Sequence, residues 1–351
     1  MVLGIVFLLN DKEKNKNTFF LGIFLLIYAL GVLRIIFYRL DFFEVPPELY
    51  GLPLNINWII FSAFYIYTQQ IYSISKSKIK YWLLYPGIIS FTLQTIIFFL
   101  PYKTKFAIIE SNWAKLFFGI GMVYGYAVGI YNLKLLKTHN LKIKNYFSQL
   151  EYKTLLWARI YIIFAIVGGI ISYILFYSLQ NNFIAKIAYV SLNFLAIYWA
   201  SYHGIVQRNI NLIFPKHKKP KKSIKKISKE KPVDEKIALK TLMKKIDDYM
   251  LNSECFTNSE LTIIDLEKGL GIHSRKLSKT INEVKKQNFN TYINRLRINK
   301  AEVLLNKKEN ANLSIEGIGS LVGFHSKSAF YNAFKKTYGT SPSKYIKTIL
   351  N

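Results

Sequence analysis

Cysteine is almost absent from this chain of 351 residues. Cys255 is the only one, which excludes an internal disulfide framework and any metal site built from several cysteines. Acidic residues are also scarce: 20 Asp and Glu face 48 Lys and Arg, and the formal net charge is +28. A strongly basic balance suits nucleic acid and an anionic membrane surface as partners.

The motifs of common catalytic sites are missing as well. The sequence has no Walker-type phosphate loop, no His-Glu-x-x-His and no serine elbow. The five histidines, which show no metal-ligand spacing, are His139, His203, His217, His273 and His325. We therefore expect no enzyme activity, no cofactor and no metal.

Long apolar runs, in contrast, are abundant, and they fall in the first 205 residues. Six of them are long enough to cross the roughly 30 Å hydrocarbon core of a bilayer as helices. They are Thr18–Leu40, Leu54–Ser73, Tyr81–Leu100, Leu116–Leu133, Leu155–Leu179 and Ile187–Val206. The apolar segment Val2–Leu9 is too short to span, and whether it is a truncated span stays open. Residues 1–206 are therefore predicted to form a polytopic helical membrane bundle.

Lysines in the connecting loops predict how this bundle is oriented. Residues 10–17 and 74–80 are lysine-rich, as are residues 134–153, whereas residues 41–53 contain no Lys or Arg. Because cytoplasmic loops carry the excess of Lys and Arg, the lysine-rich loops and the C-terminal part belong in the cytoplasm. The basic linker 207–233 is either a tether at lipid headgroups or an arm that also touches DNA phosphates.

Small residues recur on one face of the fourth run. Gly121, Gly125 and Gly129 fall four residues apart, a spacing that lets helices approach closely. Packing within the chain is one reading of this stripe, and a dimer face is the other.

Near the C-terminus, the pattern changes to two short amphipathic helices joined by a glycine. Ser314 is a good N-cap, and Ile315, Ile318 and Val322 follow at helical spacing. Gly323 suits a turn that needs a positive φ. A second helix from Ser326 has an apolar face made by Ala329, Phe330, Ala333 and Phe334. Its other face is polar and basic, as in a helix-turn-helix motif that enters a DNA major groove.

The same pattern occurs 52 residues earlier. Gly271-Ile-His-Ser-Arg corresponds to Gly323-Phe-His-Ser-Lys, and Thr262 with Asp265 forms a variant capping box upstream. The later copy has one extra residue after its serine, so Leu277 corresponds to Phe330 and Ile281 to Phe334. A helix between the copies, from Phe289 to Asn306, holds the two motifs apart. A helix beginning at Asp234, with Ile237, Leu242 and Ile246 spaced for burial, covers the first.

Several stretches of this region carry a resemblance to a known family. They are Leu-Thr-Ile-Ile-Asp-Leu (261–266), Asn-Arg-Leu-Arg-Ile (294–298), Val-Gly-Phe (322–324), Ser-Ala-Phe-Tyr-Asn-Ala-Phe-Lys-Lys (328–336) and Gly-Thr-Ser-Pro-Ser-Lys-Tyr (339–345). Residues 234–351 resemble the DNA-binding domain of the AraC/XylS family of bacterial transcription regulators. The resemblance implies an all-α, seven-helix domain with helix-turn-helix motifs at about 262–286 and 314–338, which enter successive major grooves.

The sequence departs from the family at a few positions. Glu267 and Gly319 stand where a small alanine usually packs under each turn. Gly269 lies inside a helix, where glycine costs about 1 kcal/mol relative to alanine. Ile346 replaces a usual arginine.

Residues that contact DNA are carried over from the family by position. They are Arg275, Ser278 and Lys279 in the first motif, and Lys327, Ser328, Tyr331, Asn332 and Lys335 in the second. Arg275 suits the O6 and N7 of guanine, and Asn332 suits the N6 and N7 of adenine. Lys276, Lys335, Lys336 and Lys344 suit phosphates, which position a protein without specifying sequence. Arg295 and Arg297, on the connecting helix, are expected to make salt bridges or to brace it.

Together these features predict a one-component transcription regulator anchored in the bacterial cytoplasmic membrane by several spans, with its DNA-binding domain in the cytoplasm. The membrane half is expected to sense a signal, and a homodimer is expected. Double-stranded DNA and lipid are the expected partners, RNA polymerase is a candidate, and the effector is unknown. Two alternatives stay open: a membrane transporter or enzyme with a DNA-binding feedback domain, and a simple anchor without sensing.

Overall fold

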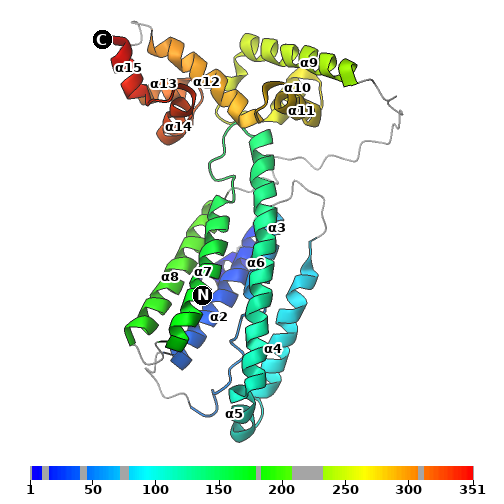
Figure 1. The fold of residues 1–351 in the computed structure, drawn as a ribbon, viewed down its shortest axis with the longest axis vertical. Coiled ribbons are helices and arrows are strands. Elements are labelled where there is room, and N and C mark those ends of the chain that lie inside the picture. The colour runs from blue at the N-terminus through cyan, green and yellow to red at the C-terminus, as the bar shows by residue number, and fades with distance from the viewer. Residues whose placement is uncertain are drawn as a thin grey trace. The chain divides into compact units, whose positions relative to one another are not determined.

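The computed structural model is an all-α protein in every part that it describes (Figure 1). The described residues are 2–9, 16–39, 46–71, 79–178, 183–207, 232–306 and 312–350. Contacts divide the chain into two compact units. The N-terminal unit comprises Met1–Asn140 and Tyr152–Lys216, and the C-terminal unit comprises Leu141–Glu151 and His217–Asn351. The dense part of the basic linker, 216–231, lies outside the described residues.

Apolar helices build the N-terminal unit. They are α1 (Val2–Leu9), α2 (Lys16–Arg39), α3 (Ile60–Ile71), α4 (Tyr85–Phe98) after the 3-10 turn η2 (Tyr81–Leu84), α5 (Tyr102–Glu110), α6 (Asn112–Tyr146), α7 (Leu156–Ser178) and α8 (Phe183–Val206). Within the described residues, three helical stretches are long and apolar enough to cross a membrane: Thr18–Phe37, Tyr81–Phe98 and Asn112–Tyr146. A shorter apolar stretch covers Leu156–Ile171.

Two helices differ from their predicted runs. The run predicted from Leu54 becomes helical only at Ile60, because Asn55 holds the preceding turns: its side chain accepts from the Asn57 amide at 3.2 Å, and its own amide donates to Gln94 at 3.0 Å. The run predicted to end at Leu133 continues as α6 to Tyr146. Its added turns carry lysines, whose charge ends the apolar run but not the helix.

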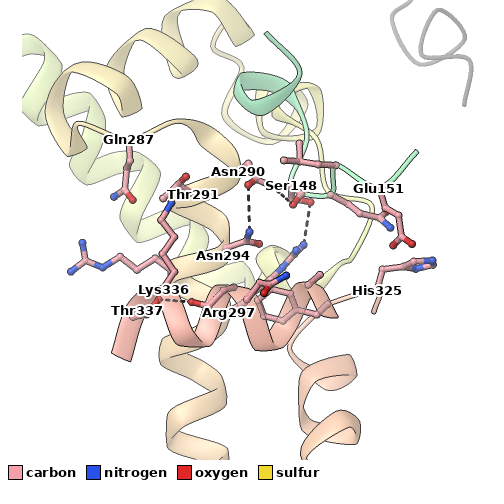
Figure 2. A pocket seen from close by; sticks show the side chains of 17 residues that line it. Ser148, Glu151, Gln287, Asn290, Thr291, Asn294, Arg297, His325, Lys336 and Thr337 are labelled. Carbon is pink, nitrogen blue, oxygen red and sulfur yellow. Dashed lines mark hydrogen bonds between the residues drawn. The ribbon is translucent and has the colours of Figure 1, made fainter. Parts of the chain in front are cut away.

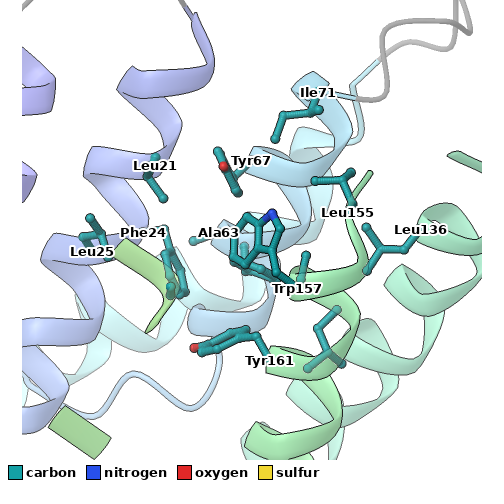
Figure 3. Packing of buried hydrophobic residues seen from close by; sticks show 14 of the residues in the cluster. Leu21, Phe24, Leu25, Ala63, Tyr67, Ile71, Leu136, Leu155, Trp157 and Tyr161 are labelled. Carbon is teal, nitrogen blue, oxygen red and sulfur yellow. The ribbon is translucent and has the colours of Figure 1, made fainter. Parts of the chain in front are cut away.

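The core of the N-terminal unit is aromatic. Leu21 and Phe24 of α2 meet Phe64 of α3 and Trp157 and Tyr161 of α7 in one buried cluster (Figure 3). The ring centroids of Phe24 and Phe64 are 4.9 Å apart, and those of Phe64 and Tyr161 are 4.8 Å apart.

The glycine stripe of α6 packs within the chain. A Cβ added to Gly121 would lie 2.4 Å from Nε1 of Trp58, and one added to Gly129 would lie 2.9 Å from the ring of Phe61. Gly125 approaches the carbonyl of Asn57 at 3.0 Å by the same measure. The glycine stripe is therefore explained by packing within the chain, the first of the two interpretations given above.

Much of the outer surface of this unit is apolar. Phe99, Trp113, Ile184 and Tyr198 are each more than 70% exposed. Apolar side chains exposed in this way are unfavourable in water.

In its described residues, the C-terminal unit contains seven α-helices together with the end of α6. They are α9 (Pro232–Ser253), α10 (Ile263–Leu270), α11 (Ser274–Lys285), α12 (Phe289–Leu305), α13 (Ile315–Leu321), α14 (Lys327–Tyr338) and α15 (Pro342–Leu350), with the 3-10 turn η4 (Cys255–Thr257) before α10. The predicted seven-helix, all-α domain is thereby confirmed. In Figure 1, α12 runs between the pair α10–α11 and the pair α13–α14.

Each pair of helices has its own hydrophobic core. Leu277 and Ile281 of α11 are fully buried with Leu242 and Ile246 of α9. Phe330 and Phe334 of α14 are buried with Ile298 and Ala301 of α12. The expected burial of Ile237 is wrong: its side chain is 60% exposed, because it lies on α9 before the turns that cover the first core.

Candidate nucleic-acid interface

The first helix-turn-helix motif consists of α10, its turn and α11. Thr262 and Asp265 form the expected capping box: Asp265 accepts from the Thr262 amide at 2.9 Å, and Thr262 accepts from the Asp265 amide. Gly271 ends α10 with a φ of 66°. Nδ1 of His273 then accepts from the Arg275 amide at 3.1 Å and caps the start of α11. The capping role of His273 was not predicted.

The second motif consists of α13, its turn and α14. Ser314 and Ser326 cap the two helices through the amides of Gly317 and Ala329. Gly323 has a φ of 100°, and a Cβ there would lie 2.4 Å from the carbonyl oxygen of Thr257. The turn therefore packs directly against η4, and the close approach links the second motif to the segment that precedes the first.

The departures from the family pattern have local explanations. Glu267 uses its carboxylate to accept from the Ser274 amide at 3.0 Å, so it caps α11 as an alanine could not. Gly319 leaves room for the ring of Phe330, which would lie 2.9 Å from an added Cβ. Gly269 likewise faces the hydroxyl of Tyr249.

The predicted DNA-contacting residues of the first motif differ in accessibility. Arg275 and Lys279 are exposed on α11. Ser278 is buried, with 8% of its surface exposed, and its hydroxyl accepts from Nδ2 of Asn282 at 3.4 Å. The helix therefore presents Arg275 and Lys279 to solvent and holds Ser278 beneath other atoms.

The residues of the second motif that are predicted to contact DNA all lie on α14, but they differ in how exposed they are. Lys327, Ser328, Asn332 and Lys335 are exposed on α14. Tyr331 is half-buried, and its hydroxyl lies 3.3 Å from both Glu316 and Ser343.

Glu316 was not singled out from the sequence, yet it contacts two predicted DNA ligands. Lys327 places its ammonium 2.6 Å from the Glu316 carboxylate, which lowers the pKa of that carboxyl and raises the pKa of Lys327. A phosphate that binds Lys327 has to replace this acidic partner. Nothing in the local spacing around Glu316 reveals the contact, because it joins α13 to α14.

Arg297 braces the domain through carbonyl groups, where the sequence analysis allowed either a brace or a salt bridge. Its side chain is 2% exposed and donates to the carbonyls of Phe256 and Asn258, each at 2.7 Å, and to Oγ of Ser148 at 3.1 Å. Burial lowers the pKa of Arg297 to about 10, so the guanidinium stays charged at neutral pH. Its position four residues after Ile293 is a signal that could have placed it on the buried face of α12.

A pocket of about 540 Å³ opens beside this arginine (Figure 2). Its walls are the segment Ser148–Glu151, the start of α12 and one side of α14. The α14 residues that line it include Ala329, Asn332 and Lys336. The pocket thus borders one predicted base-reading side chain and one predicted phosphate contact. Within the described residues, no group of three or more His, Cys, Asp or Glu side chains could hold a metal ion.

Comparison with known proteins agrees with this geometry. Residues 266–348 match the family of helix-turn-helix domains. The chain is also 37% identical, over 93 residues, to the Msm operon regulatory protein of Streptococcus mutans, a match that covers 26% of this chain and 32% of that protein. The chain thus spans about a third of the length of this relative. Both findings support a DNA-binding transcription regulator of the AraC type.

A solved structure of a protein of unknown function from Listeria innocua is also similar to part of this chain. It is 26% identical and covers 30% of this chain and 95% of its own, with a TM-score of 0.26. A TM-score this low carries no argument about structure or function.

Proposed function

We propose that this protein is a membrane-anchored transcription regulator that binds specific DNA sequences through both helix-turn-helix motifs. The observation that carries the proposal is the paired arrangement of α11 and α14, each the second helix of its motif and each with an exposed candidate for base recognition, Arg275 or Asn332. The helix α12 between the motifs has 17 residues and is about 26 Å long. One monomer therefore offers two reading helices to one stretch of DNA.

Membrane anchoring is supported by the surface and the lengths of the N-terminal helices. Three described stretches suit a bilayer, and the apolar side chains on their outer faces would lie in lipid. The segment Leu141–Glu151 contacts the helix-turn-helix domain, so both belong on the same side of the membrane. Positive-inside reasoning assigns both to the cytoplasm, where the DNA is.

Control by a signal is the remaining part of the proposal. A regulator confined to a membrane meets DNA only from the membrane surface, so pairing of two copies in the plane of the membrane is a plausible means of control. We propose that the N-terminal unit receives the signal and that the helix-turn-helix domain acts as a homodimer at promoters, where RNA polymerase is the candidate partner.

Selection from a pool of random DNA duplexes tests DNA recognition. The full chain in lipid nanodiscs should enrich sites with two boxes about one helical turn apart. Arg275→Ala and Asn332→Ala should each relax one box, with a loss of about 1–3 kcal/mol of discrimination. Asn299→Ala, which removes an exposed amide from α12, is the matched control and should leave both boxes intact.

Sequence-blind binding that disappears at modest salt would contradict this proposal, because phosphate contacts alone behave in that way. Anchoring has its own test: the chain should remain in the membrane fraction after washing with alkaline carbonate. Release into the supernatant as a folded protein would contradict the membrane assignment while leaving DNA recognition untouched.

A further inference from the structure

The connection between α6 and α7 belongs to the C-terminal unit. Leu141–Glu151 is separated by 80 residues from His217, where the rest of that unit resumes, yet the contacts group the two stretches together. Phe147 and Ser148 are 1% and 2% exposed, and Tyr146 packs against the core of the first motif. The segment is therefore built into the domain.

Specific hydrogen bonds hold this segment in one register. Phe147 pairs with Thr262 in an antiparallel bridge, and the Ser148 amide donates to the Leu261 carbonyl at 3.1 Å. Asn290 donates to the Ser148 carbonyl at 2.6 Å. Oγ of Ser148 accepts from Arg297 and donates to the Ser259 carbonyl at 3.2 Å. Figure 2 shows Ser148 beside Arg297 and Asn290.

One end of the segment contacts α11 at Asn282, on the face expected to read DNA. Asn282 follows Arg275 and Ser278 by seven and four residues, so all three lie on one face of the helix. Nδ2 of Asn282 donates to Oδ1 of Asn145 at 3.3 Å and to Ser278 at 3.4 Å. The end of α6 is thus joined to the face on which Ser278 was expected to read DNA, and Ser278 is buried there.

The other end of the segment borders the recognition helix of the second motif. Ser148–Glu151 forms one wall of the pocket, and Asn332 and Lys336 of α14 form another. Glu151 is the acidic side chain among these lining residues, and Arg295, Arg297 and Lys336 are the basic ones. The segment therefore occupies one wall of a pocket whose other wall carries Asn332, expected to read a base, and Lys336, expected to bind a phosphate.

We propose that the segment Asn145–Glu151 is an intramolecular competitor of DNA, so that the helix-turn-helix domain binds its site only when this segment withdraws. This inference rests on the proposed DNA-binding function and names its regulation. Because the segment continues directly from α6, a displacement of that helix pulls on the residues that contact α11. The proposed competitor thus belongs to the C-terminal unit and is joined through α6 to the N-terminal unit.

A reversible tether tests the competition. In a Cys255→Ser background, Asn145→Cys and Asn282→Cys would be joined by a short thiol-specific cross-linker with a reducible bond, in the full chain in nanodiscs. DNA affinity would be measured with the enriched duplex, or with the random duplex pool at low salt. We expect the tether to weaken DNA binding by about 5- to 150-fold, the range typical of coupled sites, and reduction to restore it.

Release of the segment provides the opposite test. Phe147→Asp, which places a charge at a buried position, should strengthen DNA binding, and Leu141→Ala, an exposed change six residues earlier, should not alter it. Equal affinity with and without the tether would overturn the inference and leave the proposed function standing. The proposed function itself would be overturned if no form of the protein bound DNA, neither the tethered protein, nor the reduced protein, nor the Phe147→Asp variant.

Discussion

Gly319 and Phe330 show how a single residue sets the packing under the second turn. The Phe330 side chain is 1% exposed and fills the space where an added Cβ at Gly319 would lie. The family resemblance leads one to expect an alanine at this position, but in this protein the Phe330 ring fills the space of the alanine side chain. The sequence showed that glycine replaces the usual alanine. It could not show that Phe330 fills the space, because Phe330 belongs to the next helix.

We therefore expect Gly319→Ala to destabilise the second motif by about 1–3 kcal/mol, the usual cost of overpacking a core. Amide hydrogen exchange of α13 and α14 in the full chain would measure the loss. Gly317→Ala, on the same helix, meets only the Ser314 hydroxyl at 3.1 Å and should be neutral or mildly stabilising. Equal protection in both variants would contradict the proposed role of the ring.

Serine, threonine and glycine signals located the helix boundaries well. The capping box at Thr262, the N-cap at Ser314, the start of a helix near Ser326 and the positive φ of Gly323 were all predicted from local chemistry and are all confirmed. Burial of Ser278 was not predicted, because the sequence analysis placed it on the exposed face of its helix. Local sequence determines caps and turns, whereas accessibility depends on the whole fold.

At the scale of elements, α15 is joined to α12 through one carboxylate. Glu302 accepts hydrogen bonds from the hydroxyls of Tyr338 and Tyr345, the latter at 2.6 Å. These bonds lower the pKa of Glu302 from its ordinary value of about 4.5. A carboxyl with a lowered pKa in the folded state contributes its stabilisation above the unfolded value and loses it as the pH falls.

The docking of α15 should accordingly weaken as the pH falls below about 4.5 and through the lowered pKa of Glu302. Cleavage by pepsin within α15, followed from pH 5 to 3, would report the loosening. Glu302→Gln should be cleaved faster at the upper end of this range and should show a weaker pH dependence. Glu283→Gln, an exposed carboxyl on α11, should follow the wild-type profile, and a Glu302→Gln profile identical to it would contradict the assignment.

The ends of the apolar helices in the N-terminal unit were also difficult to predict from the sequence. Hydropathy located the apolar runs, but it marked the end of one run at Leu133, where α6 continues to Tyr146. Lysines ended the apolar signal while remaining good helix formers, so the pattern could not separate the end of a span from the end of a helix.

At the scale of the molecule, the helix-turn-helix domain is assembled from two separate stretches of the chain. Sequence analysis placed all of residues 1–206 in the membrane half, because nothing in Asn-Tyr-Phe-Ser-Gln-Leu at 145–150 marks it as a partner for residues made much later. The buried guanidinium of Arg297 was recognisable on α12, but its acceptor Ser148 was not.

A peptide of residues 141–151 should therefore bind in trans to an isolated fragment of residues 232–351. We expect it to raise the melting temperature of the fragment, with a stabilisation of about 2.7 kcal/mol at a hundred times its Kd. A Ser148→Ala peptide, which cannot accept from Arg297, should stabilise the fragment less. Identical melting curves with and without the peptide would contradict the two-stretch assembly.

The hydrogen bond between Arg297 and Ser148 also has a consequence for the order in which the parts of the protein fold. Chains fold from the N-terminus as they are synthesised, so α6 and α7 are formed before α12 leaves the ribosome. The helices of the C-terminal unit, which are synthesised later, then pack their hydrophobic core around the segment Leu141–Glu151, which is already present. Under the proposed membrane anchoring, a chain whose early helices fail to insert would leave Arg297 without the Ser148 hydroxyl and would become a substrate for proteases. Quality control of the membrane half would in this way prevent the release of a stray regulator into the cell.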